Sequence, residues 1–175
     1  MSTKPNARFA VRPKAAPTRD ACALVEELGL AAHPEGGFYR ELFRSERHVA
    51  TVGGGRSALT VIYFLLTADS FSAWHRLRSD ETWHFAAGTA LTIETLDERS
   101  GHERILLGPD GPWVAVIPAG TAFAAHLDAA EGFALVSCCV APGFDFADFQ
   151  LLDGESLAAR FPEHRELALR YARSG

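Results

Sequence analysis

Residues 74–88 read WHRLRSDETWHFAAG. Two histidines, a glutamate and two tryptophans fall within this stretch, in an otherwise apolar part of the chain. Such a mixture is typical of a pocket wall, where a few polar side chains project among aromatic ones. We therefore expect a β-hairpin here that carries a binding site, with the rest of the chain supplying the strands around it.

Short runs of β-branched and aromatic residues continue on both sides of this hairpin, separated by Gly, Pro, Asp and Ser. No helical crossover interrupts them, so antiparallel pairing and a sandwich or double-sheet barrel are expected. The predicted strands span residues 38–45, 57–67, 71–77, 82–86, 90–97, 102–107, 113–117, 122–127, 133–141 and 147–152. The sequence thus predicts an all-β fold.

Helical spacing occurs near the two ends of the chain. The apolar residues between positions 21 and 28 follow it, and Gly29 can end that helix. The spacing returns after Gly154. Residues 1–17 are polar and basic, and we expect a flexible arm. Residues 18–175 are long enough for a single domain with a sizeable core.

Composition excludes several classes of function. The first 17 residues hold four bases and no acid, which leaves 13 bases against 22 acids in the rest, so an acidic body and no nucleic-acid partner are expected. Apolar runs are too short to cross a membrane, and the N-terminus lacks a secretory signal pattern, which predicts a cytoplasmic protein. The three cysteines form neither a disulfide framework nor a C-x-x-C pair.

The motifs of the chain resemble those of the cupin superfamily. The spacing His75-x-Leu77-x3-Glu81-x6-Gly88 resembles the first cupin motif, and Pro118-Ala119-Gly120-x2-Phe123 resembles the second. Three segments also resemble signatures of the cupin-5 group of uncharacterised proteins: HPEGG at 33–37, SDETWHF at 79–85 and PGFDFADF at 142–149. The resemblance implies an antiparallel double-stranded β-helix, the jelly-roll or cupin barrel, with short N-terminal and C-terminal helices. It also implies a homodimer, which would cover exposed sheet edges.

The resemblance departs from a cupin metal centre. Such a centre uses two histidines and a glutamate from the first motif and a histidine from the second, whereas Leu77 and Phe123 occupy two of the imidazole positions. Neither side chain has a lone pair to give, and a tightly held transition metal needs three or four protein ligands. We therefore expect no cofactor, with a divalent metal on His75 and Glu81 as the alternative.

The predicted site has two catalytic residues, His75 and Glu81, and six ligand-binding residues: Arg40, Tyr63, Trp83, His84, Phe123 and His126. Strand alternation places His75, Glu81 and Trp83 on one face. The same period puts His84 on the other face unless a bulge shifts it, and it raises the same objection to His126. Glu35 ranks below these residues, because its neighbours Gly36 and Gly37 indicate a tight turn.

His75 and Glu81 are expected to act as an acid/base pair inside the barrel. Burial raises the pKa of a carboxyl group and lowers that of an imidazole, whereas mutual proximity has the opposite effects. Metal-free cupin epimerases and isomerases of nucleotide sugars abstract a proton beside a carbonyl, and the resemblance implies the same chemistry here. We expect a small polar metabolite of the sugar or nucleotide-sugar class as the ligand. The alternatives are a metal-dependent dioxygenase or hydrolase, a non-catalytic ligand-binding protein, and a filled barrel in which the two residues only satisfy each other.

Overall fold

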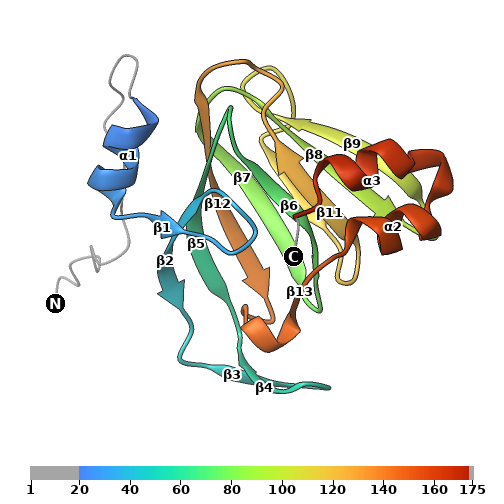
Figure 1. Ribbon diagram of the computed structural model, residues 1–175. Helices are drawn as coiled ribbons and strands as arrows, with labels where there is room; N and C mark the ends of the chain where they lie inside the picture. Colours follow the sequence, from blue (N-terminus) through green and yellow to red (C-terminus); the bar gives the residue numbers. More distant parts are fainter. Residues whose placement is uncertain (1–19, 174–175) are drawn as a thin grey trace, which may run out of the picture.

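The structure is a computed structural model that describes residues 20–173, and the predicted arm at 1–17 lies outside that range. Two antiparallel sheets face each other and form the predicted jelly roll (Figure 1). In order across the first sheet, the strands are β1 (Ala31–Ala32), β2 (Phe38–Arg44), β5 (Thr60–Thr67), β12 (Phe133–Ala141), β7 (Asp80–Gly88) and β10 (Val114–Ile117). Across the second sheet they are β13 (Phe149–Leu151), β6 (Phe71–Leu77), β11 (Ala122–His126), β8 (Leu91–Asp97) and β9 (Gly101–Leu107).

Each of the ten predicted strands has a counterpart within a few residues, which confirms the all-β prediction. A further hairpin, β3 (His48–Thr51) with β4 (Gly54–Ser57), is not expected from the sequence, because Gly53, Gly54 and Gly55 indicate a loop. This hairpin extends away from both sheets (Figure 1), and most of its residues are exposed. It therefore lacks the alternation of apolar residues on which strand prediction depends.

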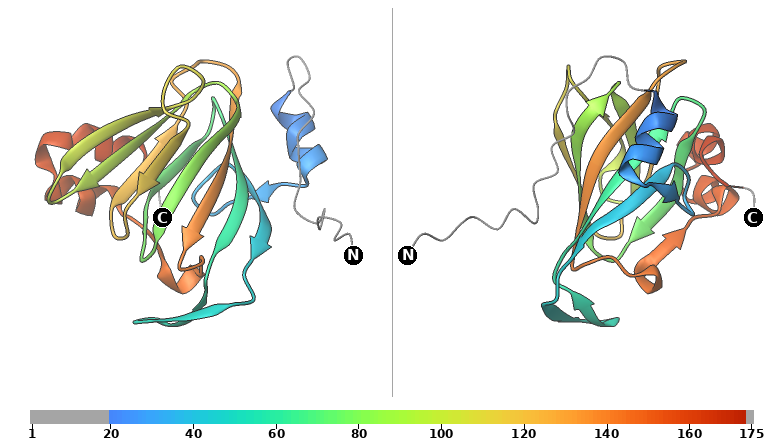
Figure 2. Two further views of the ribbon diagram at one scale, coloured as in Figure 1. Left: turned by 180° about the vertical axis from the view of Figure 1, so that it is seen from behind. Right: turned by 90° about the vertical axis from the view of Figure 1, so that its left-hand side faces the viewer.

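Helices cover the outer faces of both sheets (Figure 2). Helix α1 (Ala21–Leu28) is capped by Asp20 and ends at Gly29, and its Leu24 and Leu28 pack on outward residues of β5 and β12. Helices α2 (Gly154–Arg160) and α3 (Arg165–Arg170) cover the second sheet, where Leu157 and Ala168 meet Trp74 of β6. Short 3-10 turns at Phe146–Asp148 and Pro162–His164 complete the C-terminal segment. No helix among the described residues combines the length and the apolarity needed to cross a membrane.

The main core lies between the two sheets. Along β5, Phe64 and Leu66 point inward to this core, while Tyr63 and Leu65 point outward under α1. This is the alternation that a strand buried on both faces requires. Burying each large apolar side chain contributes about 1.5–3 kcal/mol. The barrel is therefore stabilised by three apolar clusters, one between the sheets, one under α1, and one under α2 and α3.

A β-bulge in β6 positions the functional residues. His75 pairs with Phe123 of β11, but Ser72 pairs with Ala125, so β6 has one residue more than its partner between these pairs. The extra residue resets the strand phase, and Ser72 and His75 both face the interior although they are three positions apart. Trp74 faces outward to α2 and α3.

The turn at residues 33–37 docks against this bulge. The backbone N–H of Ala73 donates to the carbonyl oxygen of Glu35 over 2.8 Å. Gly36, with φ of +117°, lies so close to β6 that a Cβ atom there would be 2.0 Å from the carbonyl oxygen of Phe71. A glycine is therefore required at this position, and its absence of a side chain lets the turn place Glu35 at the interior end of β6.

Candidate functional site

A cavity of about 310 Å³ opens at one end of the barrel, between the two sheets and beside the 3-10 turn Phe146–Asp148. Two histidines and two glutamates line its interior: His33 and Glu35 from the docked turn, His75 from β6 and Glu81 from β7. All four residues are at least nine-tenths buried. Aromatic and aliphatic side chains form most of the remaining wall.

The carboxyl group of Glu35 lies at the centre of this polar group. Its Oε1 atom accepts a hydrogen bond from the Ser72 hydroxyl over 2.9 Å. Its Oε2 atom lies 3.3 Å from Nε2 of His75 and 3.4 Å from Nδ1 of His33. One carboxyl oxygen thus faces two imidazole nitrogens.

One hydrogen bond between each ring and the backbone determines which nitrogens carry protons. Nδ1 of His75 donates to the carbonyl oxygen of Ala73 over 2.7 Å, so Nε2 of a neutral His75 is a lone pair. Nδ1 of His33 accepts from the backbone N–H of Glu35 over 3.3 Å and is therefore also a lone pair. An ionised Glu35 would face both lone pairs with no proton between them. The geometry instead fits a protonated Glu35 that donates to one of the two histidines.

Burial drives the electrostatics in the same direction. Desolvation raises the pKa of Glu35 to about 8, against the opposing effects of the Ser72 hydroxyl and the Arg173 charge. Desolvation also lowers the pKa of His75 to about 4, although the Ala73 carbonyl favours its charged form. The pKa of His33 falls to about 4 through burial, with smaller contributions from His75 and Arg173. At neutral pH all three groups are uncharged, in agreement with their hydrogen bonds.

Glu81 forms the second acidic position of the cavity. Burial, together with the nearby Glu35, raises its pKa to about 8, while contacts with Trp83 and Cys138 oppose the shift. The indole N–H of Trp83 is buried and has no hydrogen-bond partner among the described residues, but it adjoins the Glu81 carboxyl group. The thiol of Cys138, on β12 beside Trp83, has its pKa raised by burial and by the same carboxyl group.

The structure gathers four of the eight predicted site residues. His75, Glu81 and Trp83 line the cavity. The ring of Phe123 lies behind His75, with 4.0 Å between the ring centroids, and packs within the main core. The strand period in the sequence therefore groups His75, Glu81 and Trp83 correctly, whereas the expectation for Phe123 rests on its place in the second cupin motif.

The other four lie on outer surfaces of the sheets. Arg40 donates to the carbonyl oxygen of Leu28 over 2.8 Å, and Tyr63 packs in the cluster under α1. His84 turns away from the cavity and bonds to the Thr82 hydroxyl over 3.0 Å. Strand alternation carries each of these side chains through the sheet to the face opposite the cavity.

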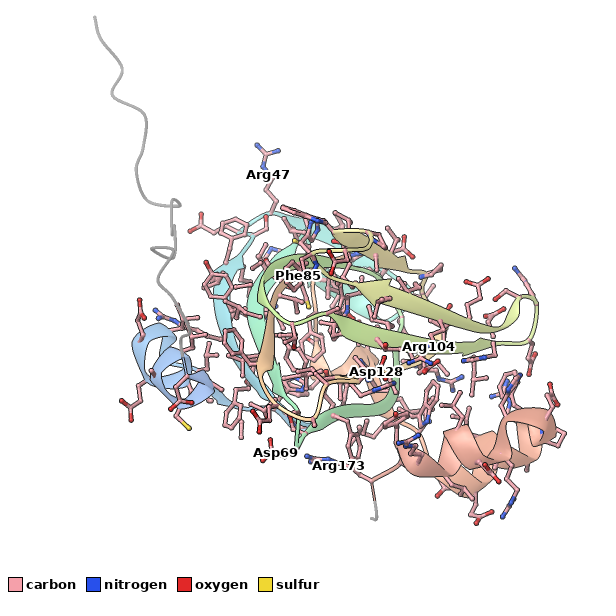
Figure 3. The ribbon with its side chains drawn as sticks, turned by 90° about the horizontal axis from the view of Figure 1, so that it is seen from above. Arg47, Asp69, Phe85, Arg104, Asp128 and Arg173 are labelled. Carbon is pink, nitrogen blue, oxygen red and sulfur yellow. The ribbon has the colours of Figure 1, made fainter. Side chains whose placement is uncertain are left out.

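His126 belongs to a separate polar cluster under α3. Its ring stacks on Tyr171 at 4.5 Å, and its Nε2 lies 3.3 Å from the buried Glu94 carboxylate. Figure 3 shows Arg104 and Asp128, which form an ion pair of 2.7 Å, near α3 on this same side of the barrel. His126 therefore does not reach the cavity.

Glu35, which ranks low on sequence evidence, and its neighbour His33 occupy the centre of the site. The sequence indicates a turn at these residues, and they do lie in one, with Gly36 and Gly37 both at positive φ. The available signal is the HPEGG segment, which stands out as a signature. The segment cannot reveal that the turn docks onto β6. The hydrogen bond between Ser72 and Glu35, for example, joins residues 37 positions apart in the sequence.

The cavity does not fit a cupin metal centre. Within residues 20–173, no group of three or more His, Cys, Asp or Glu side chains has an arrangement that could hold a metal ion. Leu77 and Phe123 offer no ligand atoms, so two of the four ligand positions of the cupin centre lack a donor. The donor set therefore lacks the convergent ligands that a tightly held transition metal needs.

Comparisons with known proteins agree with the fold. The sequence profile of the Cupin_5 family, described as cupin superfamily (DUF985), matches residues 22–152. An uncharacterised protein of Saccharomyces cerevisiae is 29% identical over 180 residues, covering 85% of this chain and 83% of that protein. A hypothetical protein from Leishmania major is 34% identical with a TM-score of 0.83, covering 89% of this chain and 100% of its own. A Shewanella oneidensis protein is 35% identical with the same TM-score, covering 90% and 100%.

More distant structures share the fold alone. A variant of the oxalate decarboxylase of Bacillus subtilis has a TM-score of 0.52 at 15% identity and covers 80% of this chain and 36% of its own. At this distance the similarity concerns the arrangement of the strands and says nothing about the chemistry of the cavity.

Proposed function

The chain belongs to the Cupin_5 family of the cupin superfamily, and on that footing we propose that its cavity binds a small polar metabolite and moves a proton on it, as an isomerase or epimerase. In this proposal His75 is the base. Glu35 and Glu81 are the two acids, and Glu35 joins the pair that the sequence predicts.

One observation carries the proposal: Oε2 of the buried Glu35 lies 3.3 Å from Nε2 of His75 and 3.4 Å from Nδ1 of His33 inside an open cavity. Burying several titratable groups is unfavourable unless they are paired, and a core that needed only to be filled would use apolar residues. Acids such as Glu35 and Glu81, whose pKa values are displaced toward neutrality in a cavity that a ligand can enter, are typical of proton-transfer sites.

The geometry supports a simple sequence of steps. The lone pair on Nε2 of His75 takes a proton from a carbon beside a carbonyl group of the ligand. The protonated Glu81 donates to the carbonyl oxygen as negative charge develops on it, and the free indole N–H of Trp83 is available as a second donor. For an isomerisation, His75 then gives the proton to the neighbouring carbon. For an epimerisation, Glu35 gives its own proton to the opposite face of the same carbon, and the contact between Nε2 of His75 and Oε2 of Glu35 passes the first proton back to Glu35. In both cases an enol hydroxyl returns a proton to Glu81, and no cofactor is needed.

The size of the cavity supports a sugar-sized group. A volume of about 310 Å³ lies at the lower end of the roughly 300–1,000 Å³ range of ligand pockets. In a nucleotide sugar, the sugar would enter the cavity and the nucleotide would remain outside it. Arg44 in the lining is already bonded to both carboxylate oxygens of Glu41 and to the carbonyl of Phe144.

Solvent exchange tests the proposal. A panel of keto and aldo sugars, sugar nucleotides and small hydroxy acids is incubated with the protein in deuterium oxide, and incorporation of deuterium at carbon is followed by NMR. We expect exchange with at least one compound and a loss of about 100-fold or more in His75→Ala, since general bases contribute about 10²–10⁴-fold. His48→Ala, in the exposed hairpin, is the matched control.

Exchange at the wild-type rate in His75→Ala would refute the assignment of the base. Binding without exchange, detected by thermal shift with the same panel, would support a non-catalytic ligand-binding protein instead. Metal analysis of protein purified without chelator addresses the metal-dependent alternative, for which a stoichiometric metal that His75→Ala loses would be the supporting result.

A further inference from the structure

We propose that the ligand of the barrel cavity is a small organic cation, such as an ammonium-bearing metabolite, and that the cavity discriminates against neutral and anionic compounds of the same shape. The inference rests on the cavity of the proposed function, but it replaces the neutral sugar group considered there with a positively charged group. It concerns recognition and does not require that a reaction follows.

Aromatic rings make up much of the cavity wall. Phe144, Phe146 and Phe149 form one group, with ring centroids 5.0 to 6.3 Å apart. Phe64 and Trp83 form another, with 5.5 Å between their centroids, and Tyr39 joins the lining from β2. The faces of such rings carry partial negative charge and attract cations within about 6 Å, most strongly where water is excluded.

Carboxyl groups outnumber cations around the same space. Glu35 and Glu81 lie inside the cavity, and Glu41 and Asp145 lie on its exposed rim. Among the described residues of the lining, Arg44 is the one arginine or lysine, and its guanidinium donates to Glu41 over 2.7 and 3.1 Å and to Phe144 over 2.9 Å. An anionic ligand would therefore find no free cation here, whereas a cationic one would meet rings and carboxyl groups.

The two interior acids carry protons, and a bound cation could replace one of these positive charges. Each acid is buried, and Glu35 raises the pKa of Glu81 by repulsion, so both hold a proton when no positive charge is near. The other titratable or charged groups that act on them are His33, His75 and Cys138 in the lining, and Arg173 near the 33–37 turn. A bound cation would favour ionisation of one acid and release its proton to solvent.

The unpaired indole N–H of Trp83 can stabilise Glu81 when that acid ionises. It adjoins Glu81, and the interaction lowers the pKa of that carboxyl group. Once Glu81 ionises, the N–H gains a charged acceptor, which is a stronger hydrogen bond than one to a neutral partner. A neutral polyol would need several free polar groups instead, and the Thr60 hydroxyl in the lining already accepts from the backbone N–H of Phe144.

A pair of isosteric probes tests the inference directly. Choline chloride carries a permanent positive charge, and 3,3-dimethylbutan-1-ol has the same shape without it. Each is titrated into ¹⁵N-labelled full-length protein, and the indole N–H signal of Trp83, assigned with Trp83→Phe, reports binding. We expect a saturable shift with choline and at least about tenfold weaker binding of the alcohol, consistent with a desolvated cation–π site.

The pH dependence of choline binding is the second measurement. Choline does not titrate, so displacement of one proton from a group with a pKa of about 8 predicts that the Kd falls as pH rises from 6 to 8, by up to about tenfold per unit, and levels off above 8. Glu81→Gln, or Glu35→Gln if the first variant is poorly folded, should flatten this dependence. Glu103→Gln, on the exposed side of β9, should retain it.

Phe149→Leu separates charge from shape. Loss of one ring should weaken choline by about 2- to 30-fold and leave the alcohol unchanged. Equal affinity for the two probes, or no response to either at 100 mM, would overturn the inference. Because the readout is binding, choline recognition without deuterium exchange on any carbon acid would leave this inference standing and refute the isomerase. Deuterium exchange without choline binding would support the isomerase and overturn this inference.

Discussion

The buried acids and histidines predict an unusual dependence of stability on pH. Burial raises the pKa values of Glu35 and Glu81 from 4.5 to about 8. Between these values the folded protein keeps protons that the unfolded chain has lost, so each acid lowers stability by about 1.4 kcal/mol per pH unit as pH rises. This loss begins above pH 4.5 and is complete above pH 8.

The two histidines act in the opposite direction over a different range. Burial lowers the pKa values of His33 and His75 from 6.5 to about 4. Between these values the unfolded chain binds protons that the folded protein does not, so each histidine raises stability by about 1.4 kcal/mol per pH unit up to pH 6.5. From 4.5 to 6.5 the two effects cancel. Between 6.5 and 8 only the acids contribute, and stability falls by about 2.7 kcal/mol per pH unit, or about 4 kcal/mol in all.

Urea unfolding at constant temperature, followed from pH 5 to 8.5, measures this profile. We expect a plateau to about pH 6.5, then a fall, then a second plateau above pH 8. Glu35→Gln should reduce the slope between 6.5 and 8 by about half, because one of the two titrating groups is gone. Glu103→Gln should reproduce the wild-type curve. Wild-type stability that stays constant or rises from 6.5 to 8 would show that the acids are ionised in the folded state.

Two further predictions concern packing. Gly36→Ala should destabilise the protein by about 3 kcal/mol or more, because a Cβ at φ of +117° would collide with the carbonyl oxygen of Phe71. Differential scanning calorimetry measures the loss, and an unchanged Tm would contradict the close docking of the turn. The cysteines should alkylate in the order of their exposure: Cys22 in native protein, and Cys138 only after denaturation, because its thiol is buried with a raised pKa. Mass spectrometry after iodoacetamide resolves this, and early labelling of Cys138 would contradict the burial of its thiol.

Local patterns in the sequence are sufficient to predict most of the fold. The period of two along β5, β6 and β7 locates the strands and sorts His75, Glu81 and Trp83 from His84. The cap residues of α1 and its terminal Gly29 are likewise readable, because caps depend on a few adjacent residues. These features share one property: their causes lie within a few residues of each other in the sequence.

The centre of the site depends on contacts between distant segments. Nothing near Glu35 in the sequence indicates that Ser72 and His75 will face it, because the bulge in β6 that turns both inward is visible only in its pairing with β11. Arg40 illustrates the converse error. Its position on a strand that follows the 33–37 turn suggests a cavity residue, but pairing with β5 places it on the helix-covered face.

The docked turn has a consequence for how such a barrel can change its chemistry. Residues 33–37 supply one of the two interior histidines and one of the two interior glutamates, yet they precede β2 and are joined to β6 by a few hydrogen bonds. The strands of the barrel thus form the walls of the cavity, and the five-residue turn supplies two of its polar side chains. Exchanging that turn, with Gly36 retained for clearance, offers protein engineers a route to new specificities that leaves both sheets untouched.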